Sequence, residues 1–134
     1  MYERILVPLD GTETDRVIID HLLELAKIHN SKIYLIRVLH LHTRDELTFE
    51  TKKTENYLKN YMEMFKKEGI HSRSLIEYGE PERVIPQKAK ELNVDLIAMA
   101  THGHNWLIDI LFGSVAHKVR HTVSIPVLMI KGKH

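Results

Sequence analysis

Short apolar runs alternate with longer amphipathic segments along the whole chain, and this alternation constrains the fold more strongly than any other sequence feature. The apolar runs are nearly continuous and rich in leucine and β-branched residues, which is typical of strands buried on both faces of a parallel sheet. Five strands are expected, at residues 4–10, 32–40, 71–79, 94–100 and 126–131. The intervening segments repeat apolar residues at helical spacing, and the expected helices cover residues 14–30, 47–68, 81–92 and 113–122.

Strands that alternate with helices predict a parallel sheet, because right-handed crossovers place the helices on both faces. We expect an α/β fold, an open doubly wound five-stranded parallel sheet of Rossmann-like type in the order 3-2-1-4-5. The 134 residues suit one domain, covering residues 1–134. Pro86 lies inside the third expected helix and should kink it or delay its start, because proline removes a backbone hydrogen bond. Residues 40–46 are the most loop-like part of the chain.

Composition narrows the class of protein. Apolar residues make up 43% of the chain, which is enough to bury a real core, and charged residues make up 28% with a net charge of +1. Nucleic-acid-binding proteins usually carry a strong basic excess instead. The chain has no cysteine, which excludes disulfides and fits a reducing compartment. We see no charged-then-apolar leader and no apolar run near the roughly 20 residues that span a bilayer. We therefore expect a cytoplasmic protein that binds neither nucleic acid nor membrane.

Ligands of open doubly wound sheets bind beyond the carboxyl ends of the strands, and several residues at these ends suit an anionic ligand. Asp10 ends the first expected strand, and Gly103 follows the fourth, where a missing side chain lets a phosphate or sugar approach the backbone. Gly113 and Ser114 begin the last expected helix, whose free N–H groups and positive dipole end attract an anion. From spacing alone, the same Gly-Ser pair fits an ordinary helix cap equally well.

Four pieces of the sequence, in this order, resemble the universal stress protein family of the single-domain kind. They are "ILVPLDGT" at 5–12, "GEPERVI" at 79–85, "VDLIAMATHG" at 94–103 and "LFGSVAHKVRHTVSIPVLMIK" at 111–131. The resemblance runs from end to end of the chain. It implies the same doubly wound fold and a role in the response to stress.

The nucleotide-binding branch of that family carries Gly, two residues, Gly, nine residues, Gly, and then Ser or Thr. This chain has Ala100, Gly103, Gly113 and Ser114 at those positions, so three of the four match with the spacing intact. Alanine at position 100 costs little if the backbone there is in the β region. It costs roughly 1–2 kcal/mol if φ is positive, and a methyl group that touches the ligand would cost about 1–3 kcal/mol.

The resemblance implies that the chain binds ATP with Mg²⁺ and acts as a nucleotide-dependent stress-response or signalling module. It places the adenine and ribose against Asp10 and the main chain of Val38. It places the triphosphate against the two glycines, Ser114 and the amide of Val115, with His104 as a further phosphate contact. The full set of expected nucleotide-binding residues is Pro8, Asp10, Val38, Met99, Ala100, Gly103, His104, Gly113, Ser114 and Val115.

A dimeric interaction module is the alternative function, because another branch of the same family lacks the glycine pattern and does not bind ATP. The strand at 126–131 is expected at a sheet edge, and an exposed apolar edge tends to pair with another chain. Family members commonly dimerise, often through this edge. A homodimer through the C-terminal strand is therefore expected in either case.

Catalysis and metal binding are weaker hypotheses. His102 and His104 lie in the loop after the fourth strand, but the chain has no Walker lysine and no nucleophile elbow. We expect at most a slow ATPase and assign no catalytic residue. His40, His42, His102 and His104 could meet in one crevice and suit Zn²⁺, Cu²⁺ or Ni²⁺. Solvated or capping histidines are the simpler interpretation in a chain that has ten of them.

Overall fold

Five parallel strands form one sheet in the computed structural model, which describes residues 1–40, 43–100 and 123–130. The strand order is β3-β2-β1-β4-β5, and every neighbouring pair is parallel. The strands are β1 (Arg4–Pro8), β2 (Lys32–Leu39), β3 (Ser72–Tyr78), β4 (Leu96–Ala100) and β5 (Val127–Ile130). The predicted α/β fold and the predicted order 3-2-1-4-5 are confirmed.

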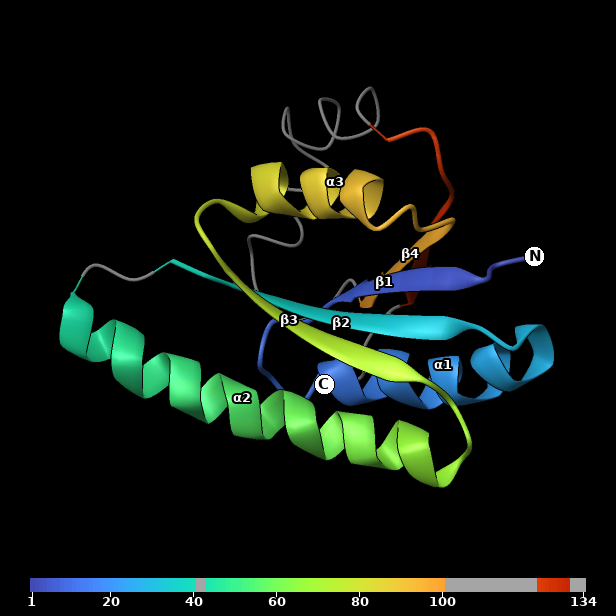
Figure 1. Ribbon diagram of the computed structural model, residues 1–134, viewed down its shortest axis with the longest axis horizontal. Coiled ribbons are helices and arrows are strands. Elements are labelled where there is room, and N and C mark those ends of the chain that lie inside the picture. The colour runs from blue at the N-terminus through green and yellow to red at the C-terminus, as the bar shows by residue number, and fades with distance from the viewer. Residues whose placement is uncertain (41–42, 101–122, 131–134) are drawn as a thin grey trace.

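Helices cover both faces of this sheet, as the alternation predicted. The three helices of the described residues are α1 (Asp15–His29), α2 (Arg44–Lys67) and α3 (Pro81–Glu91). Helices α1 and α2 lie side by side on one face, and α3 lies on the other (Figure 1). The helix expected at 113–122 lies outside the described residues. Within the described part of the chain, no helix is long and apolar enough to cross a membrane.

Each face of the sheet has its own hydrophobic core. On the face of α1 and α2, Val7 of β1 packs with Leu22 and Phe65, and all three are fully buried. On the face of α3, Leu6 of β1 packs with Ile85. Successive strand residues point to opposite faces, so a strand that is covered on both sides must be apolar at every position. This is why β1, β2 and β4 are nearly continuous apolar runs.

Helix α2 begins earlier than the sequence predicted. It starts at Arg44 rather than at residue 47, so the segment 40–46 is not a loop throughout. The reason is a cap: the side-chain oxygen of Thr43 accepts a hydrogen bond from the Glu46 N–H at 3.1 Å. A threonine followed three residues later by glutamate is the sequence signature of such a helix start.

Pro86 does not delay the start of α3, and that part of the expectation is wrong. The helix begins at Pro81, which suits a first helical position because its φ is already helical and no N–H bond is needed there. The helix continues through Pro86 to Glu91. Pro86 removes one bond, to the carbonyl four residues earlier. Pro86, Ile85 and Ala89 are buried, so tertiary packing of this apolar face stabilises the helix despite the lost bond.

Candidate functional site

The described residues of the expected site lie at the carboxyl ends of the three central strands. Pro8 and Asp10 lie at and just after the end of β1, Val38 lies near the end of β2, and Met99 and Ala100 end β4. Because β1 pairs with both β2 and β4, these ends are neighbours. All five residues are buried. The chain order reverses between β1 and β4, which makes this edge the topological switch point where such sheets bind ligands.

The other half of the expected site lies outside the described residues. This holds for Gly103, His104, Gly113, Ser114 and Val115. Their contacts with a triphosphate therefore stay a prediction from the sequence.

The loop between β1 and α1 is held by a buried carboxylate that the sequence interpretation missed. Asp15, the first residue of α1, accepts the Asp10 N–H through Oδ1 at 3.1 Å and the Gly11 N–H through Oδ2 at 2.9 Å. The only sequence signal for this role was an acidic residue in the first turn of a helix, which suggests a helix-end interaction.

The carboxylate of Asp10 is oriented by the same loop. Its Oδ1 accepts the Thr12 N–H at 2.9 Å and the Thr12 hydroxyl at 2.6 Å. Such side-chain bonds to residue i+2 form an Asx turn, which fixes the aspartate rotamer. Asp10 thus presents a buried, oriented oxygen acceptor group at the switch point, 2% exposed.

Tyr57 of α2 connects this loop to the second helix on the same face of the sheet. Its hydroxyl donates to Asp15 Oδ2 at 2.5 Å and to the Thr12 carbonyl at 3.2 Å. Its ring packs edge-on against Tyr61, with ring centres 5.2 Å apart. The sequence showed Tyr57 only as part of an apolar stripe, because its partner Asp15 is 42 residues away.

Burial dominates the electrostatics of this network. Burial, with a smaller contribution from the nearby Asp10 carboxyl, raises the pKa of the Asp15 carboxyl from 3.8 to about 7. The hydrogen bonds from Tyr57 and from the two loop N–H groups oppose this rise in pKa. Burial and the Asp15 carboxyl also raise the pKa of Tyr57 above its usual value, which keeps its hydroxyl a donor.

A cationic side chain lies over the turn at Gly11. The half-buried Arg37 of β2 donates from Nη1 to the Val38 carbonyl at 2.8 Å. Gly11 has a φ of +83°, and a Cβ built there would lie 3.2 Å from Arg37 Nε. A side chain at position 11 would therefore strain the backbone and press on the guanidinium. The positive φ favours glycine at this turn, and a side chain here would also shift the guanidinium slightly.

The backbone of Ala100 shows whether position 100 needs glycine, a question that the sequence left open. It lies in β4, in register with Ile130 of β5, and its φ is not positive. Its methyl group belongs to the core on the α1 and α2 face. The backbone at this position therefore does not require glycine, and alanine costs little strain.

Strand β5 is an apolar edge strand of the sheet, as predicted. Within the described sheet β5 pairs with β4 alone, and its side chains alternate in exposure. Val127 is 41% exposed and Met129 is 44% exposed, whereas Leu128 and Ile130 pack against the core.

The histidine hypothesis for a metal stays a prediction, because three of its four histidines lie outside the described residues. Residues 1–40, 43–100 and 123–130 contain no group of three or more His, Cys, Asp or Glu side chains placed to hold a metal ion. His40 Nδ1 instead lies 3.1 Å from Glu80 Oε1. His42, His102 and His104 lie outside the described residues.

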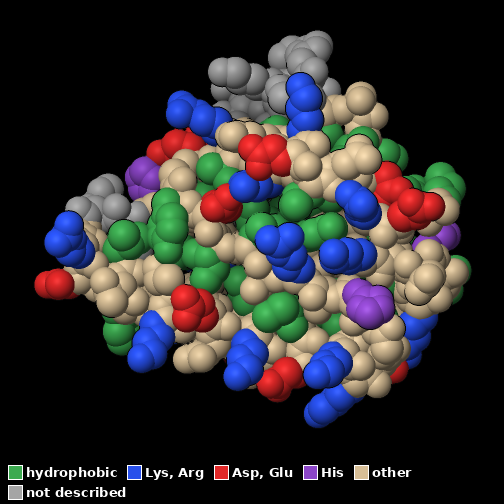
Figure 2. All heavy atoms as spheres, viewed as in Figure 1, with side chains coloured by type: hydrophobic (Ala, Val, Ile, Leu, Met, Phe, Trp, Pro, Cys, Tyr) green, Lys and Arg blue, Asp and Glu red, His purple; other side chains and the backbone are tan. Residues whose placement is uncertain are grey.

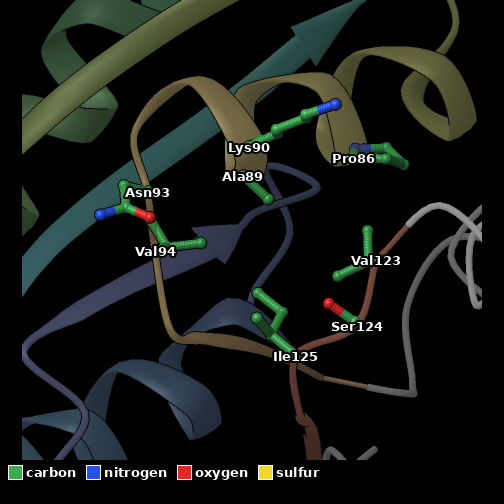
Figure 3. Close-up of a pocket in the computed structure, with 8 residues that line it drawn as sticks. All are labelled: Pro86, Ala89, Lys90, Asn93, Val94, Val123, Ser124 and Ile125. Carbon is green, nitrogen blue, oxygen red and sulfur yellow. The ribbon is translucent and has the colours of Figure 1, made fainter.

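A separate hollow of about 370 Å³ lies where α3 meets the segment before β5. Figure 3 shows Ala89, Val94, Val123 and Ile125 around it, with Lys90 on the helix beside it. These residues adjoin the amino ends of β4 and β5, whereas Asp10 follows the carboxyl end of β1. The hollow and Asp10 therefore lie at opposite ends of the strands. The apolar part of the hollow's lining continues the core under α3, whereas Lys90, Asn93 and Ser124 make the rest polar. It is distinct from the expected nucleotide site.

Comparisons with known proteins agree with this architecture. The model of the universal stress protein family matches residues 1–131. Universal stress protein MJ0577 of Methanocaldococcus jannaschii is 30% identical, over 100% of this chain and 98% of that protein. Universal stress protein YxiE of Bacillus subtilis is 28% identical, over 98% of this chain and 100% of that protein. The solved structure of MJ0577 matches with a TM-score of 0.78 and 28% identity, covering 100% of this chain and 99% of that chain.

Two further solved structures are nucleotide complexes. The universal stress protein of Archaeoglobus fulgidus in complex with dAMP is 25% identical with a TM-score of 0.70, covering 97% of this chain and 98% of that one. A universal stress protein in complex with cAMP is 19% identical with a TM-score of 0.73, covering 98% of each chain, and it shows the shared fold alone. The chain belongs to the universal stress protein family.

Proposed function

We propose that this protein binds an adenine nucleotide, ATP with Mg²⁺, at the carboxyl edge of its sheet and acts as a nucleotide-dependent stress-response or signalling module in the cytoplasm. The observation that carries the proposal is the buried loop at the switch point. There the carboxylate of Asp10 is oriented by Thr12, and the loop main chain is held by Asp15. A site that is organised before the ligand arrives loses less entropy on binding.

The described acceptors suit the base and sugar of a nucleotide. A carboxylate accepts hydrogen bonds from ribose hydroxyls, and a main-chain carbonyl accepts one from an exocyclic amino group. Asp10 supplies the first group and Val38 the second, with Pro8, Met99 and Ala100 as apolar neighbours. One family member of 25% identity is a complex with dAMP, which supports an adenine nucleotide as the ligand.

The triphosphate half of the site is proposed from the sequence. Gly113 and Ser114 would offer main-chain N–H groups and a hydroxyl at a helix start, where the dipole favours an anion. Gly103 would leave room for the phosphates, and the Val115 amide and His104 would contact them. Mg²⁺, if bound with the nucleotide, would neutralise phosphate charge, and no side chain of the chain is assigned to hold it. No residue is assigned to catalysis, and hydrolysis, if present, would be slow.

The small molecule that the purified protein releases on denaturation tests this proposal. Mass spectrometry of the released fraction should find an adenine nucleotide. A stoichiometric transition metal instead would favour the histidine hypothesis, and an empty fraction would favour a pure interaction module. Protein with Asp10→Ala, purified in parallel, should release less nucleotide than wild type. Protein with Asp20→Ala, which lacks an exposed aspartate of α1, should match wild type.

A homodimer through β5 is the second part of the proposal, and the two sheet edges support it. The outer edge strand β3 carries charged side chains, and Lys88 of α3 pairs with its Glu77 at 2.7 Å. Charges of both signs are interspersed on this side of the molecule (Figure 2). Such charges protect an edge from pairing. Strand β5 has none, and it exposes Val127 and Met129.

Light scattering at micromolar concentration tests the dimer. Wild type should show about twice the 15.7 kDa chain mass, and Met129→Lys should show a monomer because it places a charge in the apolar edge. The control Ile28→Lys changes an apolar residue on α1 that is 76% exposed, and it should remain a dimer. A wild-type protein of monomer mass would contradict this part of the proposal.

A further inference from the structure

The Val38 carbonyl is left without a strand partner by the geometry of β1. Along β2, the Ile36 carbonyl points toward β1 and accepts the Leu9 N–H at 2.9 Å. The carbonyl two residues later points to the same side, because strand groups alternate in direction. The β1 chain has by then turned away: the Gly11 N–H donates to Asp15 Oδ2. Val38 therefore offers the first carbonyl beyond the ladder, at the switch point.

Arg37 forms a hydrogen bond to this carbonyl in the structure. Its Nη1 donates to the Val38 oxygen at 2.8 Å, and within the described part of the chain this is the one hydrogen bond of its guanidinium. The remaining N–H donors lie over Gly11, which has no side chain to displace them. A cationic donor thus lies on the acceptor that an incoming base would use.

We propose that Arg37 sets the base preference of the site by competing with the nucleotide base for the Val38 carbonyl. The inference rests on the proposed nucleotide site. A 6-amino purine such as adenine must donate to this carbonyl, so Arg37 has to leave before the base can bind fully. A 6-oxo purine presents an acceptor at the same position, and it can accept from Arg37 where the guanidinium already lies.

The competition has a measurable consequence for affinity. A protein whose binding-competent form is a minor fraction binds its ligand more weakly by that fraction. If Arg37 holds the Val38 carbonyl most of the time, its removal raises the affinity for ATP, on the order of tenfold. The same removal takes away the donor for a 6-oxo purine and lowers the affinity for inosine triphosphate. One substitution therefore changes the two affinities in opposite directions.

Calorimetric titration of ATP and of inosine triphosphate, each with Mg²⁺, tests the inference in wild type and in Arg37→Met. Methionine keeps an apolar stem over Gly11 and removes the donors. Arg16→Met is the matched control, because it removes the same charge from an exposed position of α1, paired with Asp20. Circular dichroism and melting curves of all three proteins establish that they are equally folded.

The inference predicts tighter ATP binding and weaker inosine triphosphate binding in Arg37→Met, with both affinities unchanged in Arg16→Met. ATP binding by Arg37→Met alone, with none by wild type, would be the extreme form of the same result. Equal ATP affinity in wild type and Arg37→Met would overturn it, since the carbonyl would then accept both donors. Weaker binding of both nucleotides would overturn it too, because Arg37 would then be a general contact. No binding of either nucleotide by any protein would instead overturn the proposed function itself.

Discussion

The ends of β1 and β4 flank the same switch point, yet the first is followed by a polar hydrogen-bonded loop and the second consists of small or apolar residues. Beyond β1, Asp10, Thr12 and Asp15 form a buried hydrogen-bonded network with Tyr57. At the end of β4, the described residues are small or apolar and contribute no side-chain hydrogen bond, and Ala100 packs its methyl group into the core.

The difference indicates two kinds of contribution to ligand binding. In the proposed function, the β1 side would supply oriented acceptors, so a change there would alter hydrogen bonds. The segment after β4, with the glycines expected from the sequence, would supply space, so a change there would act through volume. This division of roles predicts which substitutions will be severe and which will be mild.

The largest effect is expected where space is filled beyond β4. Gly113→Val would place a branched side chain where the phosphates are proposed to approach a helix start. It should weaken ATP binding by several kcal/mol, because both the contact and the approach are lost. Ser114→Ala is the comparison, since it removes one hydrogen bond to a charged group and should cost roughly 1.5–3 kcal/mol. Calorimetric titration measures both affinities. A Gly113→Val protein that binds ATP as tightly as wild type would refute the proposal that the phosphates need the space at position 113.

The polar side is tested by Asp10→Ala. Loss of the carboxylate would remove the charged hydrogen bonds that we propose to the ribose, so ATP affinity should fall by roughly 1.5–3 kcal/mol. Thr12→Val is the matched control, because it keeps the carboxylate and removes the 2.6 Å hydroxyl bond that orients it. Its effect on affinity should be smaller. If Thr12→Val weakens binding as much as Asp10→Ala does, the aspartate acts by holding the loop and does not contact the ligand.

The network also predicts how stability depends on pH. The pKa of Asp15 is about 7 in the folded protein, against 3.8 for the free side chain. The stabilisation from protonated Asp15 is therefore complete below the unfolded value and is lost as the pH rises through the folded value. The free energy of unfolding of wild type, relative to Asp15→Asn, should fall between about pH 4 and about pH 7, by at most about 1.4 kcal/mol per pH unit.

Urea unfolding of both proteins at each pH measures this difference. Asp20→Asn is the control, because Asp20 is exposed on the same helix and pairs with Arg16. A difference between wild type and Asp15→Asn that stays constant or grows with pH would show that Asp15 remains ionised, held by its three hydrogen-bond donors.

The smallest effect is expected at Ala100. Because its backbone lies in β4 without positive φ and its methyl group packs into the core, Ala100→Gly should bind ATP as well as wild type or only slightly better. It should also lower the free energy of unfolding by about 1–2 kcal/mol, since a buried methyl is lost and glycine weakens a strand. Titration and urea unfolding measure the two effects separately. A large loss of ATP affinity in Ala100→Gly would contradict the proposal that this side of the site contributes room for the ligand.

The sequence predicted the sheet and its order, because a sheet covered on both faces needs strands that are apolar at nearly every position. It predicted the end of β4 correctly, placed the end of β2 one residue too late, and placed the end of β1 at Asp10 rather than at Pro8. It did not predict the early start of α2, where the Thr43 and Glu46 signature was overlooked. It also missed the network at Asp15. Asp15 resembles any acidic residue at a helix start, and Tyr57 resembles one member of an apolar stripe, so their contact follows only from tertiary packing.

The backbone angle at Ala100 and the position of Arg37 could not be predicted for a related reason. Both depend on where neighbouring strands end in the folded sheet, and no local sequence pattern predicts those positions. The glycine and serine positions of the phosphate half stay predictions, because they rest on spacing and resemblance.

Titration of ATP with Mg²⁺ into the wild-type protein tests the central claim most directly. We predict one site per chain, with affinity weakened in the order Ser114→Ala and then Gly113→Val, and kept or improved in Ala100→Gly. If wild type shows no binding at millimolar ATP and neither Ala100→Gly nor Arg37→Met restores it, the protein does not bind ATP at this end of the sheet, and the interaction module is the function that remains.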